Sequence, residues 1–308
     1  MINRNLIRTR VLQVAYSWYQ NKNKDLLKLE NELLFGLRKS YDLYYYHLQL
    51  LIELTNLQEE RIEAKRNKYL PSEEDLNPNT RLIDNRFIQQ LRSNRVLNSY
   101  LNERPMTWDG HESFIKKTLD DIVASDFYEA YINAEEDNYD TDKEFWRKAF
   151  RELIYLNEDL DNLLEEESIY WNDDVEIVQS FVLKTIRQFK EDAGEFQALL
   201  PMFRDEEDKQ FAVRLLRNAV NSEEHYRKLI ENHADTWDFE RIAFMDLLVM
   251  QLALAEIHAF ENIPTRVTLN EYIELAKAYS TPKSSMFING VLDSIVTQLK
   301  KENVILKQ

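Results

Sequence analysis

The sequence predicts an all-α protein, and three observations support that fold class. The 308 residues include only four glycines and six prolines, whereas the tight turns of β-sheets usually need more of both. Hydrophobic residues make up 44% of the chain and recur at helical spacing in several long segments. Aromatic residues make up 12% of the chain, so it has enough apolar surface for a sizeable core. We therefore expect a folded helical protein.

Two helices are expected in the first part of the chain. The first covers about residues 5–20, where apolar side chains recur every three or four positions. This apolar stripe consists of Ile7, Val11, Val14, Ala15 and Trp18. A long helix follows over about residues 26–66, in which the stretch from Gly36 to Ser40 is a candidate break. Two prolines and several turn-forming residues then predict a loop over 67–80.

The middle of the chain predicts four further helices separated by loops. Their expected ranges are about 81–101, 113–133, 142–167 and 174–192. Pro105 and Gly110 predict the loop over 102–112. Thr141 followed by Glu144 has the spacing of a capping box at the start of the third of these helices. Residues 194–208 are interpreted as a connector.

Four helices are expected in the C-terminal part, over about 207–233, 238–260, 268–279 and 285–302. Thr268 with Glu271 three residues later has the spacing of a second capping box. Gly290 lies inside the last helix, where a glycine costs about 1 kcal/mol relative to alanine. We therefore expect another backbone or a ligand to approach closely at Gly290.

The net charge of −16 is unevenly distributed along the chain. Residues 1–40 hold eight bases and three acids, and residues 261–308 hold six bases and five acids, so the middle of the chain carries −22. Within the N-terminal arm, Arg4, Arg8 and Arg10 offer guanidinium groups that suit phosphates and stacked bases. The alternative is that these arginines pair with the acidic part of the protein, and that the acidic surface serves solubility.

The sequence offers no recognisable catalytic or cofactor-binding motif. It contains no cysteine, no Walker A loop, no G-x-G-x-x-G motif and no H-E-x-x-H motif, and its five histidines are scattered. Neighbouring carboxylates are expected on the solvated faces of so acidic a chain. The most apolar stretch, residues 242–260, contains Asp246, Gln251 and Glu256 and is interpreted as a buried helix rather than a membrane span. We expect a soluble, cytoplasmic protein that is not an enzyme and needs no metal or other cofactor.

Four segments resemble one family. The segments are RTRVLQVAYSW (8–18), FERIAFMDLLVMQLALAEI (239–257), IPTRVTLNEYIELAK (263–277) and MFINGVLD (286–293). In this order they resemble the NusB-type transcription antitermination factors, over roughly the first 20 and the last 100 residues. The resemblance implies an all-α fold of small helical bundles and no catalysis.

The resemblance also implies a ligand and partners. Members of the family bind the boxA element of ribosomal RNA leaders as single-stranded RNA, together with the small-subunit ribosomal protein that doubles as NusE. The complex joins RNA polymerase with NusA and NusG and suppresses premature termination. Transferred to this sequence, the implied RNA-binding residues are Arg4, Arg8, Arg10, Lys283, Ser284, Phe287 and Asn289. The implied partner-binding residues are Tyr16 and Glu240. For Phe287, stacking on an unpaired base and plain core packing remain open alternatives.

The sequence departs from the family pattern between its first helix and Phe211. About 190 residues lie there, where the family usually has a short helix and a loop. The predicted domains are therefore an N-terminal RNA-binding helix (1–24), an acidic helical insertion or extended N-terminal bundle (25–205) and a C-terminal NusB-like domain (206–308). A second hypothesis is a non-enzymatic helical adaptor whose acidic insertion docks another protein. A third, an RNA cytosine methyltransferase with a NusB-like domain, lacks the cysteine nucleophile and the cofactor-binding domain that it would need.

Overall fold

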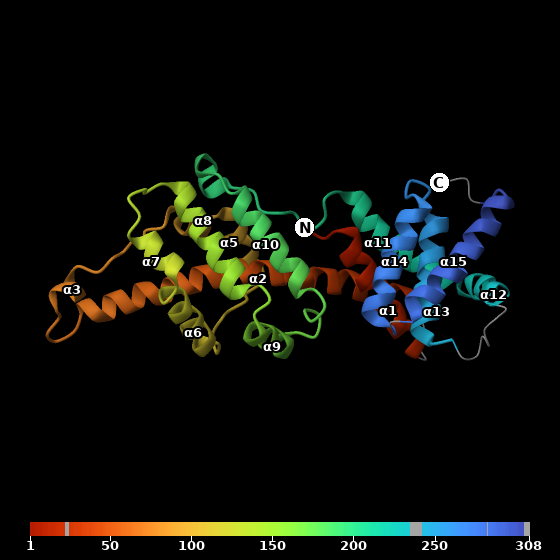
Figure 1. The fold of residues 1–308 in the computed structure, drawn as a ribbon, viewed down its shortest axis with the longest axis horizontal. Coiled ribbons are helices and arrows are strands. Elements are labelled where there is room, and N and C mark those ends of the chain that lie inside the picture. Colours follow the sequence, from red (N-terminus) through yellow and green to blue (C-terminus); the bar gives the residue numbers. More distant parts are fainter. Residues whose placement is uncertain (22–24, 235–241, 282, 305–308) are drawn as a thin grey trace. The chain divides into compact units, whose positions relative to one another are not determined.

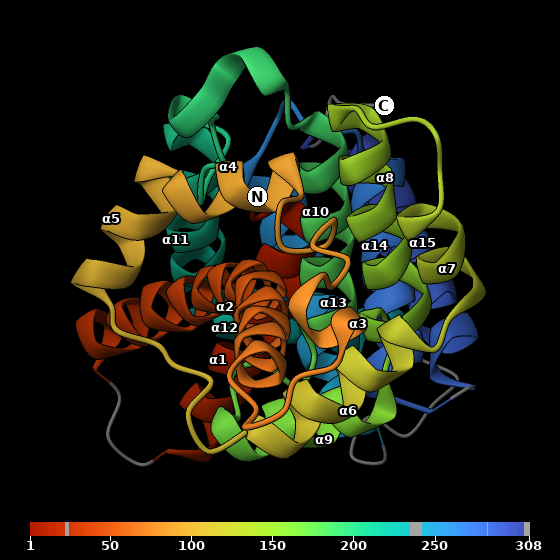
Figure 2. The same cartoon turned by 90° about the vertical axis from the view of Figure 1, so that its left-hand side faces the viewer.

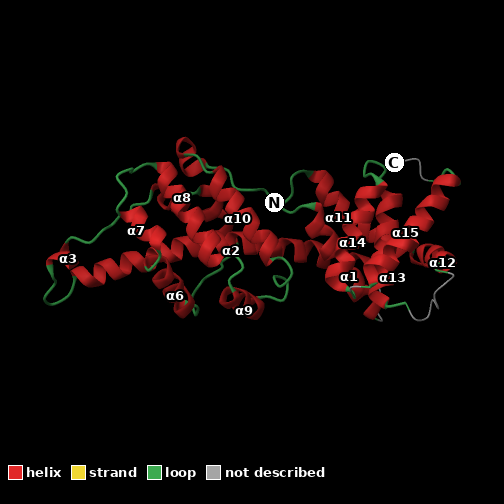
Figure 3. Cartoon of the chain, viewed as in Figure 1, coloured by secondary structure: helices red, strands yellow, loops and turns green. Residues whose placement is uncertain are grey.

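The computed structural model describes residues 1–21, 25–234, 242–281 and 283–304. Every regular element in these ranges is helical, and the only strand-like pairing among them is an isolated bridge between Ile2 and Phe203 (Figure 3). The predicted all-α fold class is confirmed. The chain forms two compact units. We call residues 2–37 with 203–308 the terminal unit, and residues 38–202 with Met1 the insertion unit.

Helix α13 is the core of the terminal unit (Figure 1). The helices of this unit are α1 (Arg4–Gln20), the start of α2 (Leu26–Arg66), α11 (Glu206–Asn221), α12 (Glu223–His233), α13 (Phe244–Ala259), α14 (Thr265–Tyr279) and α15 (Ser284–Lys301). α13 packs against α1, α11, α12, α14 and α15. Its residues from Leu248 to Ile257 are all buried, as expected for a helix that is apolar all round. The terminal unit is therefore a bundle built around one central helix.

The insertion unit surrounds the rest of α2, from Arg38 onward. Its other helical segments are α3 (Glu73–Leu76), α4 (Arg86–Ser93), α5 (Arg95–Glu103), α6 (Glu112–Val123), α7 (Asp126–Ile132), α8 (Tyr139–Ala149), the π-helix η1 (Phe150–Ile154), α9 (Glu158–Glu167), α10 (Val175–Gln188) and the 3₁₀ segment η2 (Glu191–Phe196). In Figures 1 and 2, α5 lies on one side of this part of α2, and α6 and α9 lie on the opposite side. α2 is continuous through Gly36 to Ser40, so the candidate break there does not occur.

Short polar residues that cap new helices divide two of the predicted helices. The range predicted as 81–101 is split at Asn94, whose side-chain oxygen accepts the Leu97 N–H at 3.0 Å and so starts α5. The range predicted as 113–133 is split at Ser125, whose hydroxyl accepts the Tyr128 N–H at 3.2 Å. Periodicity alone did not reveal these boundaries, because the apolar pattern continues across each cap.

Two other long predicted helices are also divided in the structure. The range 142–167 is broken by η1 and by Leu156, which has a positive φ of 54°. Its capping box joins Asn138 and Thr141, so the predicted box of Thr141 and Glu144 was wrong by three positions. The range 207–233 is divided at Ser222 into α11 and α12.

The capping box predicted at Thr268 was also wrong. α14 already begins at Thr265, directly after Pro264, so Thr268 lies within the helix. Its hydroxyl instead donates to the Glu256 carboxylate at 2.9 Å. The Thr268 hydroxyl, which the sequence pattern assigned to a local cap, therefore bonds to a buried carboxylate on the neighbouring helix α13.

The glycine that lies at a close contact is Gly36, whereas the sequence predicted a close contact at Gly290. A Cβ placed on Gly290 would have no neighbour within 4 Å, so the predicted close approach of another backbone is wrong, and the predicted approach of a ligand stays a prediction. A Cβ placed on Gly36 would lie 2.8 Å from Cδ of Arg10. Gly36 therefore lets the start of α2 lie close against α1 within the terminal unit.

Along the sequence, the boundaries between the two compact units differ from the predicted domain boundaries. The units change between Leu37 and Arg38 and between Met202 and Phe203, whereas the sequence predicted changes after residues 24 and 205. The difference at the first boundary arises within α2, whose first residues belong to the terminal unit and whose later residues belong to the insertion unit. The predicted functional division into three domains stays a prediction.

A neutral histidine is buried in the insertion unit. Nδ1 of His47 lies 2.9 Å from the carbonyl oxygen of Leu43, to which it donates, and Nε2 accepts from the amide of Gln179 at 3.3 Å. Burial lowers the pKa of His47 from 6.5 to about 4, although its bond to Leu43 acts in the opposite direction. The folded protein therefore holds this imidazole in its uncharged form.

We expect His47 to make stability depend on pH between about 6.5 and 4. In this window the unfolded chain binds a proton at His47 and the folded chain does not, so stability is full above pH 6.5 and falls as pH decreases. The expected slope is about 1.4 kcal/mol per pH unit. Urea unfolding of the insertion unit within the full chain, at several pH values, measures the slope of stability against pH. The slope should be smaller in His47→Gln. It should be unchanged in His225→Gln, the control that changes an exposed histidine. Equal slopes in both variants would contradict this role.

Candidate nucleic-acid interface

Helix α1 is the element that carries the predicted basic arm. Asn3 caps it by accepting the Leu6 N–H at 2.9 Å. Its apolar stripe faces the core of the terminal unit, with Ile7, Val11 and Ala15 fully buried. The first predicted helix is thus confirmed. The question for function is which of its three arginines the fold leaves exposed.

Arg8 lies inside the terminal unit rather than on its surface. Its Nε and Nη2 each donate to the Glu256 carboxylate of α13 at 2.8 Å, and the two side chains are 4% and 0% exposed. Thr268 and Tyr272 of α14 donate to the same carboxylate at 2.9 and 3.1 Å. The Nη1 atom of Arg8 also lies 3.4 Å from the carboxylate of Glu271. One buried ion pair therefore joins three helices.

The ionisation of this network follows from its burial. Burial alone would lower the pKa of Arg8, but the hydrogen bonds and charge of Glu256 outweigh it and raise the pKa. Burial, reinforced by the neighbouring Glu256 charge, raises the pKa of Tyr272 well above its ordinary value. The network thus consists of a charged arginine, its carboxylate partner and neutral hydroxyl donors.

The other two arginines of the arm have different environments. Arg10 is 5% exposed and packs against Gly36, so its side chain, like that of Arg8, is part of the interior. Arg4 is partly exposed, and its guanidinium lies 3.2 Å from Glu207 and 3.3 Å from Asp208. It also lies 5.0 Å from the ring centre of Phe211. The sequence predicted an exposed cluster of three arginines, whereas the fold leaves only Arg4 of the three at the surface, because Arg8 is paired with the buried Glu256 and Arg10 is packed against Gly36.

The predicted residues at the start of α15 are likewise divided between surface and interior. Lys283 and Asn289 are exposed, and Phe287 is half-buried. Ser284 is buried, and its hydroxyl lies 3.1 Å from that of Ser280 and 2.8 Å from that of Thr281. Ser284 therefore holds the turn that precedes α15 instead of facing solvent.

A seam between α1 and α14 connects the two groups of predicted residues. Arg8 contacts Glu271 at one point of the seam, and Gln13 contacts the Tyr279 hydroxyl at 3.4 Å further along both helices. The N-terminal end of the seam opens into a hollow of about 370 Å³. Its polar lining residues are Asn3, Arg4, Asn5, Arg8, Asn262 and Glu271. The other end leads through Tyr279 to the turn before α15.

Sequence reasoning missed the amide side chains of this seam. Asn3 and Asn5 are exposed beside Arg4, and Gln13 is half-buried midway along the seam. Amides can donate to and accept from nucleotide base edges. The available signal was their position on the polar face of α1, opposite the apolar stripe, but an isolated asparagine or glutamine in a helix is too common to single out.

The predicted protein-binding residue Tyr16 belongs to an exposed aromatic cluster. Tyr16 is 40% exposed and meets Phe244 edge-to-face, with ring centres 5.6 Å apart. Tyr19 also meets Phe244 edge-to-face, with ring centres 5.7 Å apart. Phe244, also 40% exposed, was not predicted to take part. Glu240, the other predicted partner-binding residue, lies outside the described residues.

Two kinds of feature, a metal site and a membrane-spanning helix, are absent from the described residues. These residues include no grouping of histidine and carboxylate side chains suited to a metal ion. Among the same residues, no helix combines the length and the apolar character that a membrane crossing requires.

Comparison with known proteins connects this chain to one family, over a segment that begins in the last part of the insertion unit and continues through most of the C-terminal part of the terminal unit. The family model for the NusB family matches residues 173–297. The transcription antitermination protein NusB of Salinibacter ruber is 35% identical over 132 residues, which are 41% of this chain and 82% of that protein. NusB of Koribacter versatilis is 42% identical over 98 residues (32% of this chain, 67% of that protein). NusB of Natranaerobius thermophilus is 47% identical over 72 residues (23% and 52%). No solved structure matches the chain.

We expect the ion pair of Arg8 and Glu256 to be essential for the stability of the terminal unit. Glu256→Ala leaves the Arg8 charge buried without its partner and removes the acceptor of two hydroxyls, so it should lower the free energy of unfolding by about 3–5 kcal/mol. Chemical denaturation measures the change. Glu261→Ala, an exposed glutamate after the same helix, is the control and should change stability by less than about 0.5 kcal/mol. A loss below about 1 kcal/mol for Glu256→Ala would show that the pair is dispensable.

Proposed function

This chain belongs to the NusB family, and on that premise we propose that it acts in transcription antitermination by binding boxA-type single-stranded RNA of ribosomal RNA leaders. The observation that carries the proposal is the seam between α1 and α14, which has Arg4 at one end and Lys283, Phe287 and Asn289 beyond the other. An extended strand that follows the seam would meet cationic, amide and aromatic side chains in turn. These are the side chains with which proteins hold unpaired RNA.

The distribution of charge supports RNA binding by the terminal unit. This unit holds 19 Lys and Arg against 20 Asp and Glu, a net charge of −1. The insertion unit holds 20 Lys and Arg against 35 Asp and Glu, a net charge of −15. Nucleic-acid affinity depends largely on neutralising phosphates, so the strongly acidic unit is a poor surface for RNA.

We assign direct and indirect roles to the predicted RNA-binding residues by their exposure. Arg4 and Lys283 contact phosphates, Phe287 stacks on a base and Asn289 bonds a base edge or sugar. Arg8, Arg10 and Ser284, which are buried, hold α1 and the start of α15 in position. Because Arg4 is already paired with Glu207 and Asp208, a phosphate has to compete with two carboxylates for it. We therefore expect weak RNA binding by the protein alone.

A protein partner compensates for this weak affinity in our proposal. The small-subunit ribosomal protein that acts as NusE binds at the aromatic cluster of Tyr16 and Phe244 and at Glu240. Exposed, clustered aromatic side chains are typical of protein interfaces, which supports this placement. The resulting complex joins RNA polymerase with NusA and NusG. Binding of RNA by two proteins together raises affinity without requiring a large basic surface on either.

We expect RNA binding to be specific, partner-dependent and sensitive to salt. Fluorescence anisotropy with a labelled boxA RNA and with a scrambled RNA, each with and without the ribosomal protein, measures specificity. Tighter binding of boxA than of scrambled RNA in the presence of the partner is the expected result. Equal affinity for the two RNAs under that condition would defeat the proposed function.

The phosphate contacts can be tested by a charge-matched pair of variants. Arg4→Ala with Lys283→Ala should weaken RNA binding and reduce the slope of log affinity against log salt by about 1.4, since each single-strand phosphate contact contributes about 0.7. Lys300→Ala with Lys301→Ala removes the same charge from the far end of α15 and serves as the control. An identical change in the salt slope for the two double variants would mean that only overall charge matters.

Stacking by Phe287 can be separated from its packing role. Phe287→Ala should weaken binding of the partner-bound protein to boxA RNA by about 1–3 kcal/mol, the usual contribution of one stacked base. Met286→Ala truncates the neighbouring side chain, which is 74% exposed, and should leave RNA binding unchanged. Thermal unfolding of both variants distinguishes the two roles of Phe287. A large loss of stability with no loss of RNA affinity in the folded variant would show that Phe287 is a packing residue.

A further inference from the structure

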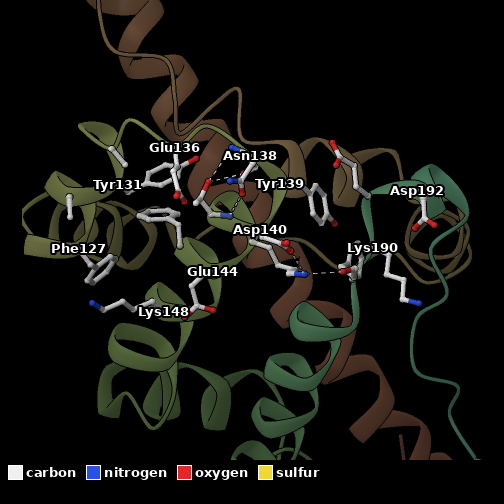
Figure 4. Close-up of a pocket in the computed structure, with 17 residues that line it drawn as sticks. Phe127, Tyr131, Glu136, Asn138, Tyr139, Asp140, Glu144, Lys148, Lys190 and Asp192 are labelled. Atoms are coloured by element: carbon white, nitrogen blue, oxygen red, sulfur yellow. Dashed lines mark hydrogen bonds and ion pairs between the residues drawn. The ribbon is translucent and has the colours of Figure 1, made fainter.

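A large hollow lies in the insertion unit, away from the residues assigned to RNA. It has a volume of about 1020 Å³ and lies among α7, the segment that follows it, α8 and residues 189–192 (Figure 4). A volume of this size is typical of sites that bind a ligand or several side chains of a peptide. The proposed RNA site does not use it, so its function has to be argued from its own residues.

The hollow has an aromatic lining. Tyr131 and Phe145 stack with ring centres 4.3 Å apart, and the ring centre of Phe127 lies 5.8 Å from that of Phe145. Tyr139 and Phe189 also contribute to the lining. Phe127 is only half-buried, so an incoming apolar side chain can cover it and gain from leaving water.

The walls of the hollow are held in place by hydrogen bonds. Arg81 donates to the carbonyl oxygen of Ala134 at 2.7 Å and lies over the ring of Tyr131, 4.6 Å from its centre. The hydroxyl of Tyr131 donates to Asp142 at 2.8 Å and accepts from the Asn85 amide at 2.9 Å. A cavity with walls fixed in this way is already formed before a partner binds, which lowers the entropic cost of binding.

The rim of the hollow is predominantly acidic. Its charged residues are Glu136, Asp140, Glu144, Glu191 and Asp192 against Lys143, Lys148 and Lys190. Lys143 is engaged within the rim, since its ammonium lies 2.9 Å from Asp140 and donates to the Phe189 carbonyl at 3.3 Å. The ammonium of Lys148 lies 5.4 Å from the ring centre of Phe127. The acidic excess of the rim agrees in sign with the net charge of −15 of the whole unit.

We propose that this hollow binds a basic segment of another protein. An aromatic or aliphatic side chain of that segment enters between Phe127 and Phe145, and flanking lysine or arginine side chains lie against Glu191, Asp192 and Glu136. An apolar anchor surrounded by complementary charge is a usual arrangement of a peptide-binding groove. The rim and the unit both repel RNA phosphates, so a cationic polypeptide is the occupant that the charges favour. The inference does not rest on the proposed RNA-binding function.

The experiment uses the full chain and two fluorescein-labelled peptides that share one pattern of leucine and tryptophan. One peptide carries lysine and arginine at the remaining positions, and the other carries glutamate and aspartate. Fluorescence anisotropy should show binding of the basic peptide at least about tenfold tighter than that of the acidic peptide, a difference of about 1.4 kcal/mol. Equal affinity for the two peptides would overturn the proposal.

Matched variants locate the binding site. Glu191→Lys with Asp192→Lys should weaken binding of the basic peptide about tenfold. Glu165→Lys with Glu166→Lys, the same charge change on the exposed face of α9, should have a much smaller effect.

The aromatic lining is tested by a second pair of variants. Phe127→Ala should also weaken binding, and Phe196→Ala, which truncates another exposed aromatic of this unit, should not. Circular dichroism confirms that each variant is folded. Equal loss in the rim and α9 variants would show nonspecific attraction to an acidic protein and would overturn the proposed site. Binding of a labelled single-stranded RNA that is weakened by Phe127→Ala would do the same, because it would identify nucleic acid as the occupant of the hollow.

Discussion

A buried ion pair, Arg8 with Glu256, links the helices on which the proposed RNA-binding surface of the terminal unit depends. Its carboxylate also accepts from Thr268 and Tyr272, so helices α1, α13 and α14 are all tied to one side chain. A buried charge that loses its partner is strongly destabilising, so the pair specifies where α1 packs. The position of α1 in turn determines where Arg4 reaches the surface and where the seam with α14 runs. In this way an internal contact defines the shape of the outer surface that we assign to RNA.

The two units divide the charge of the protein, and this division separates the two proposed binding activities. The nearly neutral terminal unit can hold an RNA strand at a few cationic and aromatic side chains. The insertion unit combines a strong negative charge with a preformed aromatic hollow, which suits a basic polypeptide rather than a nucleic acid. In our proposal the insertion adds a second, separate binding function to a member of the NusB family instead of merely lengthening its fold.

The sequence was most informative where one local pattern decides the structure. Helix α1 and the long helix α2 were predicted closely, because no proline interrupts either segment and the polar stretch NKNKD separates them. The splits at Asn94 and Ser125 were missed, since one capping side chain ends a helix without disturbing the apolar pattern around it. Of the candidate site, Lys283 and Asn289 are exposed and Arg4 is partly exposed, as a binding role requires, but Arg8, Arg10 and Ser284 are buried. The sequence did not indicate Phe244 or the hollow around Phe145, which depend on contacts between separate helices.

By itself, the sequence determined the all-α fold class, the family and the uneven distribution of charge. These properties follow from composition, from spacing along the chain and from short motifs, all of which can be read without knowing which residues meet in space. Only the tertiary structure decided which charged side chains are available for binding. Arg8 and Glu256 are separated by 248 positions in the chain, and Gly36 determines how closely a helix can approach Arg10. Whether an arginine binds a ligand or holds the core depends on such distant partners, because burial and pairing are properties of the packed structure.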